Sequence, residues 1–132
     1  MELRTYIPYS LALQFKNLGF NEYCHTWYDE NGEIHWFRLS YTNISCAGHN
    51  KSLPNNTCVA PEVTEIASWI RQEYGKFITP KFDLETGKYS YEIIDVRDEP
   101  GWLVSDSRGK SWKTPDDAVL EGIKWMMKEG RL

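Results

Sequence analysis

The sequence predicts an α+β protein, with a mostly antiparallel sheet and two main helices packed on one face of that sheet. In this chain of 132 residues, apolar side chains recur at helical spacing in 61–74 and 114–127, and at every second position along 77–96. Short turns join the predicted strands, as antiparallel pairing allows. The expected order is α-β-β-(loop)-α-β-β-β-α within a single domain. Its predicted parts are a helix plus hairpin in residues 1–38, a long polar loop in 39–60 and an α-β-β-β-α half in 61–132.

The segment 114–127 carries the most complete set of helix signals. Thr114 is a favoured N-cap residue, and Pro115 suits the first helical position. Two aspartates in the first turn place negative charge at the positive end of the helix dipole. The apolar positions fall on one face: Val119, Leu120, Ile123, Met126 and Met127. That face needs a sheet or a second helix to cover it.

A shorter helix is predicted over residues 10–18, and Gly19 ends it. Gly19 suits the left-handed conformation of a Schellman ending, which is a common way for a helix to stop. In that ending Phe20 packs back on Phe15, the usual hydrophobic partner.

A β-hairpin is predicted around Asn31-Gly32, because this dipeptide lies between the aromatic, alternating runs 23–28 and 33–38. The following residues, 39–60, are polar and show little periodicity. A loop of this length is uncommon inside a small domain, so it is functional, disordered or contains a short strand.

The second half begins with a helix over residues 61–74, which Pro61 opens and Gly75 closes. Three strands are expected after it, at 77–84, 88–96 and 102–105, with turns at Glu85-Thr86-Gly87 and Pro100-Gly101. Pro80 indicates that the first of these is an edge strand or carries a bulge, because proline cannot donate to the ladder.

Composition and charge narrow the classes of function. The net charge of −4 and the pI near 5.4 argue against a broad electrostatic footprint for nucleic acid. No apolar run approaches the roughly 20 residues that span a bilayer, and the start MELRTYIPYS lacks a signal-peptide pattern. Three cysteines without a close pair predict reduced thiols. We therefore expect a cytoplasmic protein without membrane association.

Cysteine and histidine cluster between residues 24 and 58. Cys46 and His49 have a spacing that suits two ligands of one zinc ion, and Cys24, His35 or Cys58 would complete a tetrahedral site. We take Cys46, His49, Cys58 and His35 as the candidate ligands. A structural zinc site usually shows two close pairs, and this chain has one. The competing interpretation takes Cys24 and Cys58 as small buried residues, with no cofactor bound.

One stretch combines three cations with a tryptophan: Arg108, Lys110, Trp112 and Lys113. Such residues meet phosphates and stack a base. The α-β-β-β-α order of this half resembles the double-stranded RNA-binding domain. That family carries lysines at the start of its last helix, where this sequence has Asp116 and Asp117. These carboxylates repel a phosphate backbone, so we do not expect nucleic acid as the partner.

Three segments resemble small proteins carried by bacterial phages, plasmids and integrated elements: FKNLGFNEYCHTWYDENGEI, APEVTEIASWIRQEYG and TPDDAVLEGIKWMMK. The matching positions are Leu18, Gly19, Phe20, Cys24, Pro61, Trp69, Ile70 and Arg71. The resemblance spans nearly the whole chain and implies an accessory protein of a mobile element, without a defined activity. YEIIDVRDEPGWLVS followed by DDAVLEGIK is similar to the HicB-type antitoxin module, which implies toxin inhibition as one form of binding.

Trp69 and Trp125 lie off the apolar centres of their predicted helices. If the two helices lie side by side, both indoles are exposed near Gly122. They then form an apolar patch for a partner, or for self-association as a homodimer. In the alternative interpretation, a loop or the neighbouring helix covers them.

An enzyme is not the favoured class. The sequence shows no recognisable nucleophile motif and no glycine-rich phosphate loop, although Asp95, Asp98 and Glu99 form a carboxylate group suited to a divalent ion. We therefore predict a non-enzymatic accessory protein that binds another macromolecule, in the first instance a protein. The alternatives are a small metal-dependent or nucleic-acid-processing enzyme, and a zinc-stabilised nucleic-acid-binding module.

Overall fold

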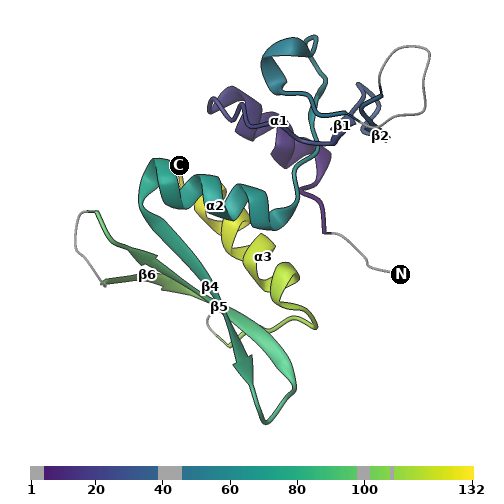
Figure 1. Cartoon of the computed structure of the whole chain (residues 1–132). Helices are drawn as coiled ribbons and strands as arrows, with labels where there is room; N and C mark the ends of the chain where they lie inside the picture. Colours follow the sequence, from purple (N-terminus) through teal and green to yellow (C-terminus); the bar gives the residue numbers. More distant parts are fainter. Residues whose placement is uncertain (1–4, 39–45, 98–101, 108) are drawn as a thin grey trace. The chain divides into compact units, whose positions relative to one another are not determined.

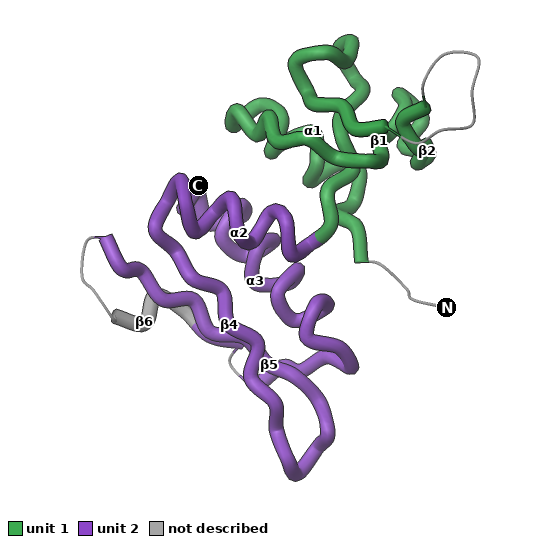
Figure 2. The backbone as a smooth tube through the Cα atoms, viewed as in Figure 1, with its two compact units in different colours: residues 1–62 green, residues 63–132 purple. Residues whose placement is uncertain are grey.

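The structure is a computed structural model that describes residues 5–38, 46–97, 102–107 and 109–132. Its helices and antiparallel strands follow the order α-β-β-β-α-β-β-β-α, which confirms the α+β class (Figure 1). The chain divides into two compact units, unit 1 with residues 1–62 and unit 2 with residues 63–132 (Figure 2). Single-domain organisation stays a prediction. In the described ranges, no helix combines the length and apolar character needed to cross a membrane.

The described part of unit 1 contains one helix, three short strands and a 3-10 turn. The elements are α1 (Tyr9–Asn17), β1 (Thr26–Tyr28), β2 (Ile34–Trp36), η1 (Asn50–Ser52) and β3 (Cys58–Val59). The strands form an antiparallel sheet in the order β2-β1-β3. The predicted helix and hairpin are therefore present. Strand β3 lies in the predicted loop 39–60, so that loop does contain a short strand; its residues 39–45 lie outside the described ranges.

Helix α1 ends as the sequence predicts. Gly19 has a φ of 99°, and its N–H donates to the carbonyl of Lys16 at 3.1 Å. The N–H of Phe20 donates to the carbonyl of Phe15 at 2.9 Å. These two bonds define a Schellman motif. Both phenylalanines are buried, so the motif turns the chain back into the core of unit 1.

Polar side chains connect the distant segments of unit 1. The Lys16 ammonium donates to three backbone carbonyls of the chain before β3, at 3.4, 3.0 and 2.7 Å. Asn50 is 4% exposed; its amide donates to the carbonyl of Phe20 at 2.7 Å and accepts from the N–H of Val59 at 2.9 Å. These bonds satisfy backbone groups that no strand or helix pairs.

Unit 2 is a three-stranded antiparallel sheet with two helices on one face (Figure 1). Its elements are α2 (Val63–Tyr74), β4 (Lys76–Asp83), β5 (Lys88–Asp95), β6 (Trp102–Asp106) and α3 (Pro115–Lys128), with strand order β4-β5-β6. Helix α2 packs on β4 and α3, and α3 packs on β4 and β5. The predicted placement of both helices on one face is confirmed, although the strands of the chain form two sheets rather than one. The predicted turn at Pro100-Gly101 lies outside the described residues.

Helix α3 combines the predicted cap with a close approach to the sheet. The Thr114 hydroxyl accepts a hydrogen bond from the N–H of Asp117 at 3.1 Å, which is the N-cap bond. Further along, a Cβ on Gly122 would lie 2.9 Å from Cγ2 of Ile78 and 3.2 Å from the ring of Tyr91. Glycine therefore lets the helix backbone lie directly on the sheet.

Strand β4 lies at the edge of the sheet, in agreement with the prediction from Pro80. The N–H of Val96 donates to the carbonyl of Gly75 at 3.0 Å. From this pair onward, hydrogen-bonded and non-hydrogen-bonded residue pairs alternate along β4 and β5. Pro80, which lies opposite Tyr91, falls in a non-hydrogen-bonded pair. The side of Pro80 that lacks an N–H therefore faces the open edge, where it hinders the addition of another strand.

Candidate functional site

The residues of the predicted tryptophan patch do not form two exposed indoles. Trp69 is 7% exposed, and its ring lies edge-on to Tyr74 with 5.7 Å between centroids. Gly122 is buried against the sheet. Trp125 is half-buried, and the Arg131 guanidinium lies 5.8 Å from the centre of its ring. The expected exposure of Trp69 is therefore wrong, because a neighbouring ring packs on its indole. Binding of a partner at Trp125 stays a prediction.

The predicted zinc ligands are Cys46, His49, Cys58 and His35. Among the residues that the structure describes, these four do not come together as one group at ligand distance. Cys58 is fully buried, and burial raises the pKa of its thiol to about 11. Cys24 is also buried. Both cysteines are thus small buried residues, and the described structure does not assemble the four predicted ligands, whereas a bound zinc ion stays a prediction.

The described residues bring together one cluster of metal-binding side-chain types, Asp29, Glu33 and His35, with ligand atoms within 4.8 Å of one another. The Asp29 carboxylate is already engaged. Its Oδ1 accepts from the N–H groups of Asn31 and Glu33 at 2.9 and 3.0 Å, and its Oδ2 lies 2.7 Å from Nε2 of His35. The hydrogen bond with His35 is the first cause that lowers the pKa of Asp29. The cluster therefore fixes the β1–β2 turn, and we assign it no ligand.

The predicted nucleic-acid stretch belongs to the sheet of unit 2. Trp112 pairs with Tyr89 through two backbone bonds of 2.7 Å each, and its indole stacks on the Tyr91 ring at 5.8 Å. Two further members of the stretch are exposed lysines: Lys110 and Lys113. Arg108 lies outside the described residues. The stack occupies one face of the indole, and base stacking on the other face stays a prediction.

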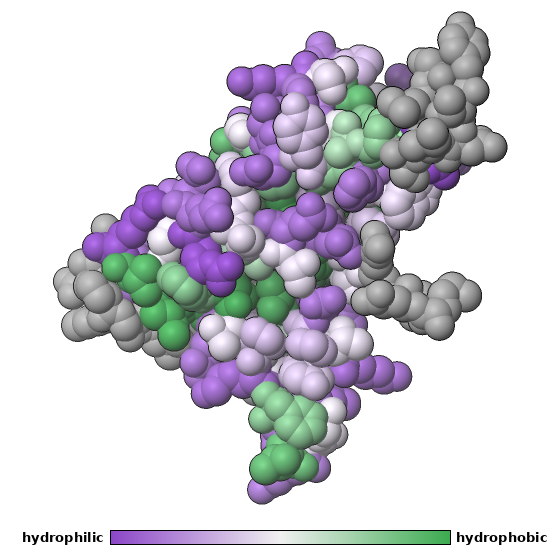
Figure 3. Space-filling view, viewed as in Figure 1, coloured by the Kyte–Doolittle hydropathy of each residue, from purple (hydrophilic) through white to green (hydrophobic). Residues whose placement is uncertain are grey.

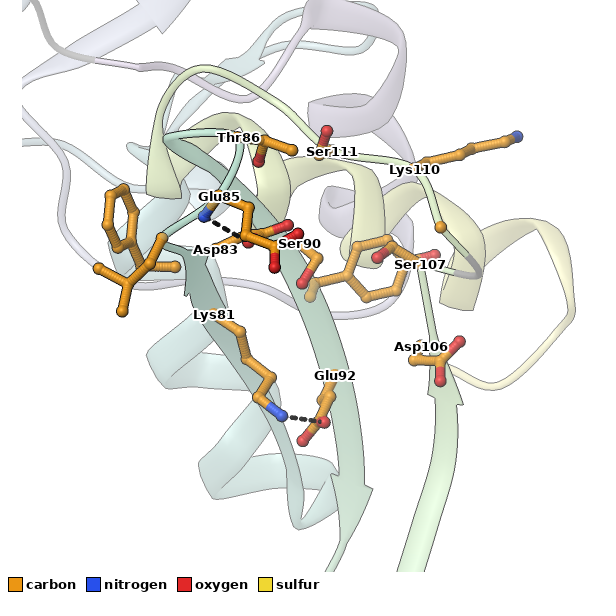
Figure 4. Close-up of a pocket in the computed structure, with 14 residues that line it drawn as sticks. Lys81, Asp83, Glu85, Thr86, Ser90, Glu92, Asp106, Ser107, Lys110 and Ser111 are labelled. Carbon is orange, nitrogen blue, oxygen red and sulfur yellow. Dashed lines mark hydrogen bonds and ion pairs between the residues drawn. The ribbon is translucent and has the colours of Figure 1, made fainter.

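A cleft of about 650 Å³ lies on the sheet of unit 2 (Figure 4). Its floor is formed by Lys81 from β4, Ser90 and Glu92 from β5, and Asp106 at the end of β6. The floor residues of β4 and β5 alternate with those that face α3, so they point to the sheet face away from the helices. One wall is the β4–β5 turn, and the other is formed by Ser107 and by Gly109, Lys110 and Ser111. After these residues the chain returns to the sheet, where Trp112 pairs with Tyr89 of β5.

Charged and hydroxyl groups line this cleft in fixed positions. The Lys81 ammonium and the Glu92 carboxylate form an ion pair at 2.6 Å across the floor (Figure 4). Asp83 Oδ1 accepts from the N–H of Glu85 at 2.9 Å, which holds the carboxylate at the turn. Ser107, on the opposite wall, is 6% exposed. These groups are positioned before any ligand arrives, which lowers the entropic cost of binding one.

Two large apolar side chains stand exposed at the margin of the cleft. Phe82 is 53% exposed and Leu84 is 89% exposed. Figure 3 shows hydrophobic side chains gathered at the tip of the β4–β5 hairpin, at the bottom of the view. The Phe82 ring also leans on Tyr89, with 5.1 Å between centroids. Exposed apolar side chains that cluster in this way mark a surface for interaction.

Sequence reasoning missed this cleft, although one signal was available. Leu84 stands directly beside the predicted turn at 85–87, where small or polar residues are the rule. The return of Trp112 to the sheet had no such signal, because a single bridge between distant residues leaves no periodicity.

Comparison with protein-family models, curated proteins and solved structures finds no match to this chain. The resemblances to mobile-element proteins and to the HicB-type module therefore remain expectations from the sequence. The cleft and its apolar margin are the features from which a function is inferred.

Proposed function

We propose that the protein binds another protein through unit 2, at the cleft and at the apolar hairpin tip beside it. The observation that carries this proposal is the exposure of Phe82 and Leu84 next to a cleft with fixed polar groups. Protein interfaces combine such apolar anchors with polar groups that set orientation. An exposed Leu84 at a turn makes no contribution to a core, which supports a role in contact with a partner.

The edge of the sheet suggests how the partner is held. Pro80 hinders the pairing of a further strand along the middle of β4, so binding by strand addition is disfavoured. We therefore expect side chains of the partner, rather than its backbone, to fill the cleft.

In this proposal the protein is an accessory protein of a bacterial mobile element. The sequence resemblance alone supports that part. One form of the proposed binding is inhibition of a toxin, because an antitoxin of the HicB type acts by binding a protein.

Affinity purification of the tagged full chain from its native host tests the proposal. The decisive variant is the double substitution Phe82→Ser and Leu84→Ser, which changes two exposed side chains. Tyr23→Ser is the matched control, because Tyr23 is 67% exposed in unit 1. We expect the wild type and the control to retain a partner that the double variant loses, with equal melting temperatures. Recovery of the same proteins by all three chains would contradict the proposal.

A further inference from the structure

Resting on that proposed function, we infer that unit 2 binds a proline-rich segment of the partner protein on a row of three aromatic rings beside the hairpin tip. The aromatic row consists of Phe82, Tyr89 and Trp112. Phe82 pairs with Tyr89 across β4 and β5, and Tyr89 pairs with Trp112 where the chain returns to the sheet. Residues that lie directly opposite each other point to the same face of a sheet, so the three rings are neighbours.

The aromatic row lies on the sheet face that carries the helices, opposite the floor of the cleft. Phe82 follows the floor residue Lys81, and side chains alternate between the two faces of a strand. Gly122 of α3 lies against Tyr91, and the pair Phe82–Tyr89 comes next on this face toward the turn. Phe82 is 53% exposed, and the other two rings are half-buried. The aromatic row is therefore accessible to a partner.

The polar atoms of the aromatic row supply a second and independent observation. The indole N–H of Trp112 and the hydroxyl of Tyr89 form no hydrogen bond with the residues that the structure describes. Both groups are donors, and Tyr and Trp in contact with a partner use them to bind its polar atoms. A proline-rich segment offers matching acceptors, because its polyproline II backbone has no internal hydrogen bonds and its carbonyls face outward. The pairing of donors with acceptors thus favours such a segment.

The angles between the rings and the charge of the chain disfavour other ligands of aromatic surfaces. The planes of Phe82 and Tyr89 meet at 54°, with 5.1 Å between centroids. Tilted rings do not form a flat platform for a sugar or a base, and they leave a furrow between them that suits the ring of a proline. The net charge of −4 also opposes a nucleic acid, whose binding depends on neutralised phosphates. Proline-rich segments commonly dock on aromatic surfaces of this kind, because their backbone is already ordered before binding.

The test is an NMR titration of the isotope-labelled full chain with two short peptides, blocked at both ends, of repeating Pro-Pro-Leu and Gly-Gly-Leu sequence. We expect the proline peptide to shift the indole N–H signal of Trp112 and the amide signals of Phe82 and Tyr89. The glycine peptide keeps the carbonyls and the leucines but is flexible, so it should need about tenfold higher concentration. A thymidine oligonucleotide and a β-glucan oligosaccharide should leave these signals unchanged. Equal responses to the two peptides, or shifts with the oligonucleotide or the oligosaccharide but not with the proline peptide, would overturn the inference.

Two variants that keep the rings and remove one donor each sharpen the test. Trp112→Phe and Tyr89→Phe should each weaken binding of the proline peptide roughly fivefold, because each loses one hydrogen bond to a peptide carbonyl. The amide signal of Phe82 reports the affinity in both variants. The control Trp125→Phe makes the same change at a half-buried indole of α3 and should bind like the wild type. Equal affinity of the four proteins, at equal melting temperatures, would contradict the inference.

Failure of this inference differs from failure of the proposed function. If the proline peptide does not bind while the double variant Phe82→Ser and Leu84→Ser loses the cellular partner, the hairpin tip binds a protein and the proline-rich segment is wrong. If the double variant retains the partner, the proposed function itself fails.

Discussion

Unit 1 and unit 2 are held together by different means. The strands of unit 1 have three, three and two residues, and side chains bonded to distant backbone groups connect its segments. In unit 2, β4 and β5 have eight residues each and form a continuous ladder beneath two helices. The polar contacts of unit 1 include two buried side chains that donate to carbonyls, Thr26 to Ala60 at 2.7 Å and Tyr28 to Ile7 at 2.6 Å.

Because of this difference, different kinds of substitution destabilise the two units. Where one buried polar side chain binds two backbone groups, its removal breaks both hydrogen bonds at once. A ladder distributes hydrogen bonds over many residues, and its weakness is the packing of the helices on the sheet. We therefore expect polar truncations to damage unit 1 most, and changes of side-chain volume to damage unit 2 most.

The largest effect is expected for Asn50→Ala. This substitution removes the buried hydrogen bonds to the carbonyl of Phe20 and from the N–H of Val59, which should lower the free energy of unfolding by about 3 kcal/mol. Urea unfolding followed by circular dichroism measures it. Asn21→Ala is the control, because Asn21 accepts one exposed bond from the N–H of Lys51 and should cost less than about 1 kcal/mol. Equal losses in the two variants would refute the importance of the buried amide.

Gly122→Val should cost about 2 kcal/mol in unit 2. The new side chain would collide with Ile78 and Tyr91, because a Cβ alone already approaches them to 2.9 and 3.2 Å. Lys124→Val introduces the same side chain at an exposed position of the same helix, and thermal melting of both variants separates packing from helix propensity. A Gly122→Val protein as stable as Lys124→Val would show that α3 does not need this close approach.

A pH dependence of the stability of unit 1 follows from Cys58. Burial raises its pKa from 9.0 to about 11 in the folded chain. The neutral thiol therefore contributes its full stabilisation below pH 9, and that contribution is lost as the pH rises to 11. Over that range the wild type should lose about 1–2 kcal/mol more than Cys58→Ala, as measured by urea unfolding at each pH. Parallel pH profiles of the two proteins would contradict the raised pKa.

The smallest effect is expected for Arg97→Ala. The Arg97 guanidinium donates to the carbonyls of Glu73 and Gln72 at the end of α2, the latter at 2.6 Å. Both bonds are exposed, so their loss should cost about 0.5–1 kcal/mol in a thermal melt. Arg97→Lys keeps the positive charge near the helix end and should recover part of the loss. An Arg97→Ala protein with the melting temperature of the wild type would show that these two hydrogen bonds contribute nothing to stability.

The two units also differ in how far their sequences predict them. The helices and strands of unit 2 were expected within about two residues, because periodicity, the Thr114 cap and Pro80 are all local signals. In unit 1 the Schellman ending at Gly19 was equally local and equally predictable. The bonds of Lys16 and Asn50 were not predicted, because Asn50 and Phe20 are 30 residues apart and such pairs leave no periodic pattern.

The candidate site shows the same limit. A helical projection places Trp69 relative to its own helix, but it does not show the Tyr74 ring that packs on the indole. Strand alternation places the floor side chains of β4 and β5 on one sheet face, but it does not show the second wall, which depends on the pairing of Trp112 with Tyr89. Leu84, an apolar residue beside the predicted turn at 85–87, was the one signal of the cleft that we name.

Photo-crosslinking in the native host tests most directly whether the hairpin tip of unit 2 is the partner site. A photoreactive phenylalanine analogue is placed in the full chain at Leu84, at Lys124 on the exposed side of α3, or at Ile34 in unit 1, which is 44% exposed. We predict a discrete crosslinked protein from position 84 and none from positions 124 and 34. A crosslink to the same protein from position 124 or 34, with none from position 84, would place the partner elsewhere and contradict the proposed function.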